Sequence, residues 1–359
     1  MTLLLGIETS CDETSVSIVA DGHKVLSNVV SSQVAKHAVF GGVVPELAAR
    51  EHLTAIIPVT NQALKDSKLT IKDIEAVAVT SGPGLMPALL VGLTFARGIC
   101  FNGHIPLVGI NHFIAHIYSA FLNENFSILG DIKSYPILAL VVSGGHTALV
   151  LIDKDKTAKI VGTTIDDAAG EALDKGAKIL NLGYLGGPII DKLSKTGNHQ
   201  AFHFPRSLTG AAGKPLLKEN LFNFSFSGLK TSLLHHLDKY GINKLKDNFL
   251  FDTVASYQYA VVDVLCIKTI KAALKFQCNS VVLCGGVAQN SLLRAELATR
   301  IPKKIKFLLP QKEYCGDNGA MIAGLGFHYL GKKETNMEVD AYSRLPEISE
   351  VPFVPSLSN

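Results

Sequence analysis

The chain has 359 residues, of which 47% are hydrophobic and 18% are charged. This length suits two domains of ordinary size, and the apolar content excludes a largely disordered protein. The formal net charge of +3 excludes neither a polyanionic partner nor a neutral one, because a local basic patch is enough to bind a nucleic acid.

The first half of the chain begins with a predicted hairpin, "LLLGIETSCDETSVSIVA", which carries Asp12 and Glu13 at its tip. A helix is predicted over 43–64. The stretch 74–100 then reads as a strand, a glycine loop and a helix with Pro87 near its start, and a short strand "IPLVGI" follows.

The second half repeats this order. A hairpin over 135–152 has Gly144 and Gly145 at its tip, and helices are predicted over 166–182 and 251–276. The stretch 279–300 is again strand, glycine loop and helix, and the strand "IKFLLP" follows. The repetition predicts an α/β protein with mixed sheets covered by helices.

Two similar halves are expected to place two hairpin tips and two glycine loops around one cleft, where free backbone amides can bind phosphate. A single glycine loop is more often only a tight turn, but four at matching positions favour a nucleotide site. The predicted domains are an N-terminal lobe over 1–130 and a C-terminal lobe over 131–330. The second lobe has an irregular insertion near 194–228, and residues 331–359 form a surface tail.

The six cysteines form no C-x-x-C pair, which indicates a reducing compartment. The N-terminus has no basic residues before its apolar run and reaches an acid at Glu8, so a strand is predicted rather than a signal peptide. The most apolar long stretch, 85–101, is interrupted by proline, glycine and arginine, and it falls short of a membrane span. We therefore expect a cytoplasmic protein without a membrane anchor.

His112 and His116 follow the strand "IPLVGI" at a spacing that puts two imidazoles on one helical face, within reach of one metal ion. No acid lies between them, so the H-E-x-x-H motif of zinc proteases is absent. A solvated face or a capping pair explains the spacing as well. In the second half, Asp317 follows the equivalent strand and completes a three-ligand set, although a helix N-cap is the alternative there.

Several stretches together resemble the TsaD family, which includes the archaeal and eukaryotic Kae proteins. They are "GIETSCDETS", "GGVVPELAAREH", "SGPGLMPALLVGL", "VSGGHT", "DDAAGEALDK", "FSFSGLKT", "CGGVAQN" and "YCGDNGAMIA". The resemblance implies the ASKHA fold (actin, Hsp70 and sugar kinases), with two duplicated ribonuclease H-like lobes around a central cleft. It also implies transfer of a threonylcarbamoyl group from threonylcarbamoyl-AMP to N6 of the adenosine 3′ of the anticodon, in tRNAs reading ANN codons, with release of AMP.

The resemblance also assigns residues and partners. His112, His116 and Asp317 hold one divalent metal, Fe²⁺ in the first place and Zn²⁺ as the alternative. Asp12 and Glu13 face the reacting end, with Glu13 a candidate proton acceptor by its position. The implied partners are tRNA, a paralogous TsaB-type subunit and a TsaE-type ATPase. The residues implied to bind the acyl-adenylate are Val141, Val142, Ser143, Gly144, Gly145, Asp174, Gly187, Asp191 and Asn290.

The chain departs from the family pattern in places. Phe113, Ile114 and Ala115 stand between the histidines, where the family often has Leu-Glu-Gly, and Gly316 and Gly319 flank Asp317 in place of bulkier residues. The nearest alternative function is a small-molecule kinase of the ASKHA fold, which has no need of the histidine pair. A metalloprotease is a further alternative, disfavoured because no glutamate stands at position 113. A non-catalytic paralogue of the family is another, disfavoured because all three ligand residues are retained.

Overall fold

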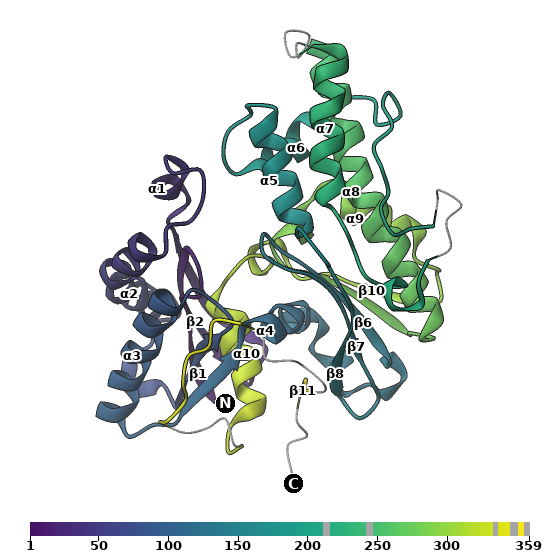
Figure 1. Cartoon of the computed structure of the whole chain (residues 1–359). Helices are drawn as coiled ribbons and strands as arrows, with labels where there is room; N and C mark the ends of the chain where they lie inside the picture. The colour runs from purple at the N-terminus through teal and green to yellow at the C-terminus, as the bar shows by residue number, and fades with distance from the viewer. Residues whose placement is uncertain (211–215, 242–246, 333–336, 345–350, 355–359) are drawn as a thin grey trace. The chain divides into compact units, whose positions relative to one another are not determined.

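The structure is a computed structural model, and it describes residues 1–210, 216–241, 247–332, 337–344 and 351–354 (Figure 1). The chain divides into two compact units. Unit 1 comprises Met1–Lys133, Lys154–Ala158 and Pro310–Asn359, and unit 2 comprises Ser134–Asp153 and Lys159–Leu309. The expected C-terminal lobe ran to residue 330, whereas unit 2 ends at Leu309.

Unit 1 is built on a five-stranded mixed sheet in the order β3-β2-β1-β4-β5. Strands β1, β2 and β3 are antiparallel neighbours, whereas β4 and β5 run parallel to β1. The strands are β1 Leu3–Glu8, β2 Glu13–Ala20, β3 Lys24–Ser32, β4 Ala76–Gly82 and β5 Leu107–Asn111.

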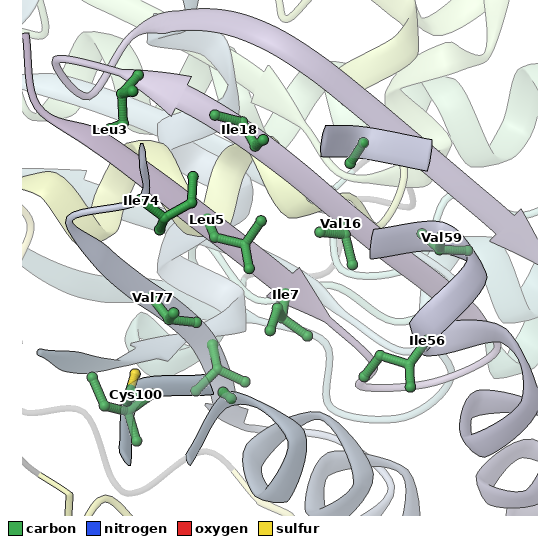
Figure 2. Packing of buried hydrophobic residues seen from close by; sticks show 14 of the residues in the cluster. Leu3, Leu5, Ile7, Val16, Ile18, Ile56, Val59, Ile74, Val77 and Cys100 are labelled. Carbon is green, nitrogen blue, oxygen red and sulfur yellow. The ribbon is translucent and has the colours of Figure 1, made fainter. Parts of the chain in front are cut away.

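Helices cover both faces of this sheet. They are α1 Val34–Ala38, α2 Pro45–Ser67, α3 Met86–Gly103, α4 His112–Tyr118 and α10 Gly319–Tyr329. Because side chains alternate along a strand, Leu3, Leu5 and Ile7 of β1 point to one face and join a core with α2 and α3, as Figure 2 shows. The other face of β1 receives α10, which approaches the backbone of Gly6.

Unit 2 repeats the same sheet. In the six-stranded sheet β10-β9-β6-β7-β8-β11, the run β8-β7-β6-β9-β10 matches β3-β2-β1-β4-β5 in order and in strand direction where both are described. The predicted duplication is therefore confirmed. The strands are β6 Ile137–Val142, β7 Thr147–Ile152, β8 Thr157–Thr163, β9 Ser280–Cys284, β10 Lys306–Leu308 and the short edge strand β11 Val351–Pro352.

The helices of unit 2 are α5 Ala169–Ile179, α6 Gly186–Ser194, α7 Ser227–Tyr240, α8 Asp247–Lys275 and α9 Ser291–Arg300. Short 3₁₀ helices connect the larger elements of the chain: η1 Ile71–Asp73, η2 Ser119–Phe121, η3 Asn123–Gly130, η4 Ile132–Ser134, η5 Lys218–Asn220, η7 Gly286–Gln289 and η8 Lys312–Tyr314. Between α6 and α7 the described residues form no long helix or strand.

Two helices are long and apolar enough to cross a membrane by length and composition alone, Met86–Gly103 and Asn248–Lys275. In the second, 67% of the most apolar window is buried within the protein, as in the core helix of a soluble protein. The first packs Leu89, Leu93 and Ala96 into the protein interior. Both helices therefore have a structural role inside the fold.

The predicted hairpins and the two strand–loop–helix stretches are confirmed, but the strand that follows each hairpin, β3 and β8, was missed. Most residues of both strands are partly or fully exposed, and polar residues interrupt their sequences, so neither strand has a continuous apolar run. The expectation of a surface tail is wrong for Phe353 and Val354, which are buried. These two apolar residues stand among prolines without periodicity, so no pattern indicated their burial.

We predict that Gly6→Ala destabilises unit 1 and displaces α10. An added Cβ would lie 2.1 Å from the carbonyl oxygen of Gly319 and 2.7 Å from the amide nitrogen of Ala323, and neither backbone atom can rotate away. The free energy of unfolding in urea should fall by about 1–3 kcal/mol, as overpacking typically costs.

The matched control is Gly98→Ala in α3, where an added Cβ has no neighbour within 4 Å. This change should leave stability unchanged or raise it by up to ~1 kcal/mol, because alanine favours helix over glycine. Equal urea midpoints for Gly6→Ala and the unmodified chain would contradict the close approach of α10 to β1.

Candidate active site and metal centre

Three predicted ligand residues meet within unit 1. Nε2 of His112 and Nε2 of His116 lie 3.1 Å apart, and Oδ1 of Asp317 is 3.1 Å from His116 Nε2 and 3.6 Å from His112 Nε2. Both imidazoles are buried, and Asp317 is partly exposed. Two histidines and one carboxylate in this arrangement can hold a metal ion.

Local structure explains how these side chains come together. Helix α4 begins directly after β5, and Asn111 caps it by accepting a hydrogen bond from Ile114 N at 3.0 Å. The i, i+4 spacing then places both imidazoles on one face. Before α10 the N-cap is Asn318, whose side chain accepts from Met321 N. The interpretation of Asp317 as the N-cap is therefore wrong, because Asn318 holds that position.

Glu8 is a part of the site that sequence reasoning missed. Its carboxylate is fully buried and accepts a hydrogen bond from Nδ1 of His112 at 2.9 Å and from Thr80 Oγ1 at 2.6 Å. With the His112 proton on Nδ1, the Nε2 lone pair faces His116 and Asp317. A carboxylate behind an imidazole is the usual way to orient a metal-binding histidine. The sequence did contain one signal for Glu8: an acidic residue at the end of an otherwise apolar strand.

The electrostatics of the group favour a positive charge. Burial alone lowers the pKa of His112, but the charges of Glu8 and Asp317 outweigh it and raise that pKa to about 9. Two Nε2 atoms and a carboxylate oxygen that converge within 3.6 Å repel one another unless a proton or a cation lies between them. The donor set therefore fits a divalent metal.

The tip of the first hairpin lies close enough to this group for the charge of Asp317 to raise the pKa of the Glu13 carboxyl. Burial, the charge of Asp317 and the charge of Asp12 together raise the pKa of Glu13 to about 9. The tip is held from behind by His52 of α2, which donates through Nε2 to the carbonyl oxygen of Cys11 at 3.0 Å. Burial and the neighbouring acids raise the pKa of Cys11, so its thiol stays protonated and is not a nucleophile.

Unit 2 contains the residues predicted to bind the acyl-adenylate. Gly144 and Gly145 are exposed at the tip between β6 and β7, and the turn is closed by Ser143 N, which donates to His146 O at 2.8 Å. Val141 and Val142 are fully buried within β6. Only the tip of this hairpin can therefore offer amides to a ligand.

Two further pairs of predicted residues meet in unit 2. Asp174 of α5 accepts a hydrogen bond from the amide of Gly187 at 3.0 Å, and burial raises the pKa of its carboxyl. Asp191 of α6 and Asn290, the N-cap of α9, are bridged by Gln258 of α8, whose Nε2 lies 2.9 Å from Asp191 Oδ1 and 3.1 Å from Asn290 Oδ1.

Gln258 was also missed from the sequence. It lies in the middle of a long apolar helix, where nothing distinguishes a buried bridging amide from an ordinary polar residue. Ser291 completes this cluster, because its amide and its hydroxyl both donate to Asp191.

Comparison with known proteins identifies the family. Residues 24–324 match the family model of TsaD, tRNA N6-adenosine threonylcarbamoyltransferase. This chain belongs to the TsaD family. A relative of that name from Syntrophus aciditrophicus (strain SB) is 47% identical over 96% of this chain and 97% of its own length. One from Geobacter sulfurreducens is 49% identical over 91% and 92% of the two chains.

The chain is thus a tRNA threonylcarbamoyltransferase, an enzyme of N6-threonylcarbamoyladenosine formation. The fold agrees with the expected ASKHA class. HypF from T. kodakarensis superposes with a TM-score of 0.58 at 15% identity, covering 92% of this chain and 47% of HypF. Component A of the Acidaminococcus fermentans (R)-2-hydroxyglutaryl-CoA dehydratase gives 0.53 at 15% identity, covering 92% and 100%.

We predict that Glu8→Gln weakens metal binding by about 10–100-fold, the usual cost of losing a partner that orients a ligand. The amide keeps the size of the side chain but no longer supplies the charge that fixes the His112 proton on Nδ1. Zn²⁺ affinity of the purified chain, measured by competition with a chelator, checks this.

The control for this measurement is His235→Ala, which removes an exposed histidine of α7. It should bind Zn²⁺ as the unmodified chain does. Undiminished affinity in Glu8→Gln would show that the carboxylate does not support the site.

Proposed function

We propose that this chain transfers the threonylcarbamoyl group of threonylcarbamoyl-AMP to N6 of the adenosine 3′ of the anticodon, in tRNAs reading ANN codons, with release of AMP. The observation that carries the proposal is the convergence of His112, His116 and Asp317 beside the acidic hairpin tip, in a chain of the TsaD family. The family fixes the reaction, and the convergence indicates where on this chain it takes place.

The three ligands are proposed to hold one divalent metal, Fe²⁺ or, as the alternative, Zn²⁺. Two imidazoles and one carboxylate suit both ions and leave positions open. A metal bound there would polarise the carbamoyl carbonyl or fix the threonyl end of the donor, lowering the cost of developing negative charge. Glu8 keeps the Nε2 lone pair of His112 directed at that position.

Glu13 is proposed as the group that accepts the proton lost by the adenine amine, and Asp12 as its acidic neighbour at the reacting end. With a pKa of about 9 the Glu13 carboxyl is protonated at neutral pH, so this role requires that a cation bound beside Asp317 lower that pKa. Both stand on the tip of the first hairpin, and Ser32 donates to Glu13 Oε1 at 3.1 Å, which holds that carboxyl. The exocyclic amine of adenine is a poor nucleophile. Holding it beside the carbonyl therefore supplies much of the acceleration.

The acyl-adenylate is proposed to bind unit 2. The amides of Gly144 and Gly145 are free to donate to its charged groups, with Ser143 beside them. The buried or half-buried polar groups of Asp174, Asp191 and Asn290, with the amide of Gly187, offer the hydrogen-bonding partners that an adenosine moiety needs. The side chains of Val141 and Val142 would support this loop from within the sheet.

A TsaB-type paralogue, a TsaE-type ATPase and tRNA are the proposed partners, in the cytoplasm. We assign the paralogue to an apolar groove of about 1070 Å³ on unit 1, between α2, η1 and α3. Leu53, Ile57 and Leu90 are 64%, 57% and 46% exposed along it, which is unusual for large aliphatic side chains side by side. Burying such a face is what a stable subunit interface does.

We predict N6-threonylcarbamoyladenosine in an unmodified ANN-reading tRNA incubated with threonylcarbamoyl-AMP, this chain and its partners. His112→Ala should lower the yield by at least about 100-fold, because removing one of three ligands leaves the carbonyl without its support. Mass spectrometry of the digested nucleosides measures the product. Full activity in His112→Ala would show that the group of His112, His116 and Asp317 is not needed for the reaction.

A second prediction concerns the groove. Leu53→Glu puts a charge into the proposed interface and should weaken association with the TsaB-type subunit by more than 10-fold, because the carboxylate would lose its hydration there. Light scattering and calorimetry check this. The matched control is Leu274→Glu in α8, whose side chain is 51% exposed in unit 2 and should bind the partner normally. Equal affinities for the two variants would place the interface elsewhere.

A further inference from the structure

Residues 34–44 of unit 1, which we call the α1 loop, expose two large apolar side chains next to each other. Val39 is 81% exposed and Phe40 is 63% exposed. They follow the short helix α1, which projects beyond the end of β3 (Figure 1). Side chains as exposed as these add little to a hydrophobic core, so packing within the fold does not account for the pair.

A buried chain of hydrogen bonds holds the base of the α1 loop. Val44 N donates to Nδ1 of His37 at 3.3 Å, so the imidazole proton lies on Nε2, which is 3.1 Å from Gln33 Oε1. Gln33 Nε2 donates in turn to Ala48 O at 3.3 Å and lies 3.3 Å from His52 Nδ1. Both imidazoles are fully buried. Because each of these groups has a partner inside the protein, the two ends of the loop are fixed relative to each other.

The same bonds connect the loop to the acidic tip of the first hairpin. Gln33 N donates to Asp12 O at 2.9 Å, and Phe40 N donates to His37 O at 3.0 Å. Since His37 is bonded to Gln33, only these two residues stand between Phe40 and Asp12 in the chain of hydrogen bonds. The loop that carries the aromatic ring is therefore anchored to the hairpin tip that the proposed reaction uses.

The exposed chemistry of the loop fits a nucleobase better than a phosphate. The lysine of α1, Lys36, forms an ion pair with Glu51, so its charge is already balanced. At its tip the loop presents one aromatic ring and one aliphatic side chain. Aromatic side chains stack on unpaired bases, and proteins commonly bind the bases of single-stranded RNA loops in this way.

We propose that Phe40 stacks on an unpaired base of the anticodon loop of the acceptor tRNA, and so helps to present the target adenosine to the hairpin tip. The proposal rests on the proposed role of Asp12 and Glu13 at the reacting end. The target adenosine adjoins the anticodon, so the neighbouring bases reach this part of unit 1 together with it. A protein subunit bound over the α1 loop would compete with the substrate for that place, which favours RNA as the occupant.

The test is Phe40→Ala, with Phe40→Tyr as the variant that keeps an aromatic face. The full-length chain with its partners is titrated against a fluorescent anticodon stem-loop RNA of an ANN-reading tRNA. Phe40→Ala should bind this RNA about 5- to 100-fold more weakly, the usual loss of one stacked base, and Phe40→Tyr should bind it normally. The factor should be the same at low and high salt, because stacking neutralises no phosphate. The KM for tRNA should rise, and the KM for threonylcarbamoyl-AMP should not.

The matched control is Leu274→Ala, which removes an apolar side chain of α8 that is 51% exposed in unit 2 and should change none of these quantities. Unchanged RNA affinity in Phe40→Ala would overturn the proposal, as would an equal loss in the control. Weaker association with the TsaB-type subunit or the TsaE-type ATPase, at unchanged RNA affinity, would show that the α1 loop binds a protein instead.

The proposed reaction and the proposed contact can fail separately. If the unmodified chain and its partners bound the RNA but formed no modified adenosine, the proposed reaction would be wrong, and the affinities of the Phe40 variants would still decide the contact. If the unmodified chain and its partners bound no RNA, the contact would be wrong as well.

Discussion

The candidate metal site of this protein depends on one buried interaction, the hydrogen bond from His112 Nδ1 to the carboxylate of Glu8. A charged carboxylate fully removed from water is costly, and it persists here because His112, Thr80 and the amide of Ser10 all donate to it. The hydrogen bond to Glu8 keeps the proton of His112 on Nδ1. It also connects the end of the central strand β1 to the start of α4, so the first strand of the sheet determines where the ligand points.

The third ligand arrives by close packing. Helix α10 lies so near to β1 that the backbones of Gly6 and Gly319 are in contact. Asp317 stands two residues before the start of this helix, and Asn318 is its N-cap. Asn318 takes the capping role, and the Asp317 carboxylate lies beside the two histidines. The close approach of two backbones thus brings Asp317 to the histidine pair, although it lies 201 residues after His116 in the chain.

The duplication gives each unit the same sheet and a different chemistry. In unit 1 the end of the first strand carries Glu8 and the acidic hairpin tip, which suits a cation. In unit 2 the equivalent tip carries exposed glycines, and the helices behind it bring Asp191 and Asn290 to Gln258. In this cluster the buried Oε1 of Gln258 has no hydrogen-bond partner among the described residues, so it can accept a hydrogen bond from a polar group.

The sequence by itself determined the duplicated order of strands and helices, the family and the three residues that could hold a metal. It could do so because these features are local: an apolar run, a glycine loop, an i, i+4 histidine pair. It did not predict Glu8, Gln258, the third strand of each unit or the burial of Phe353. Those depend on contacts between residues far apart in the chain, such as 104 positions for Glu8 and His112. Only the tertiary structure decides which distant group a buried polar side chain meets, because burial is a property of packing and not of any short stretch.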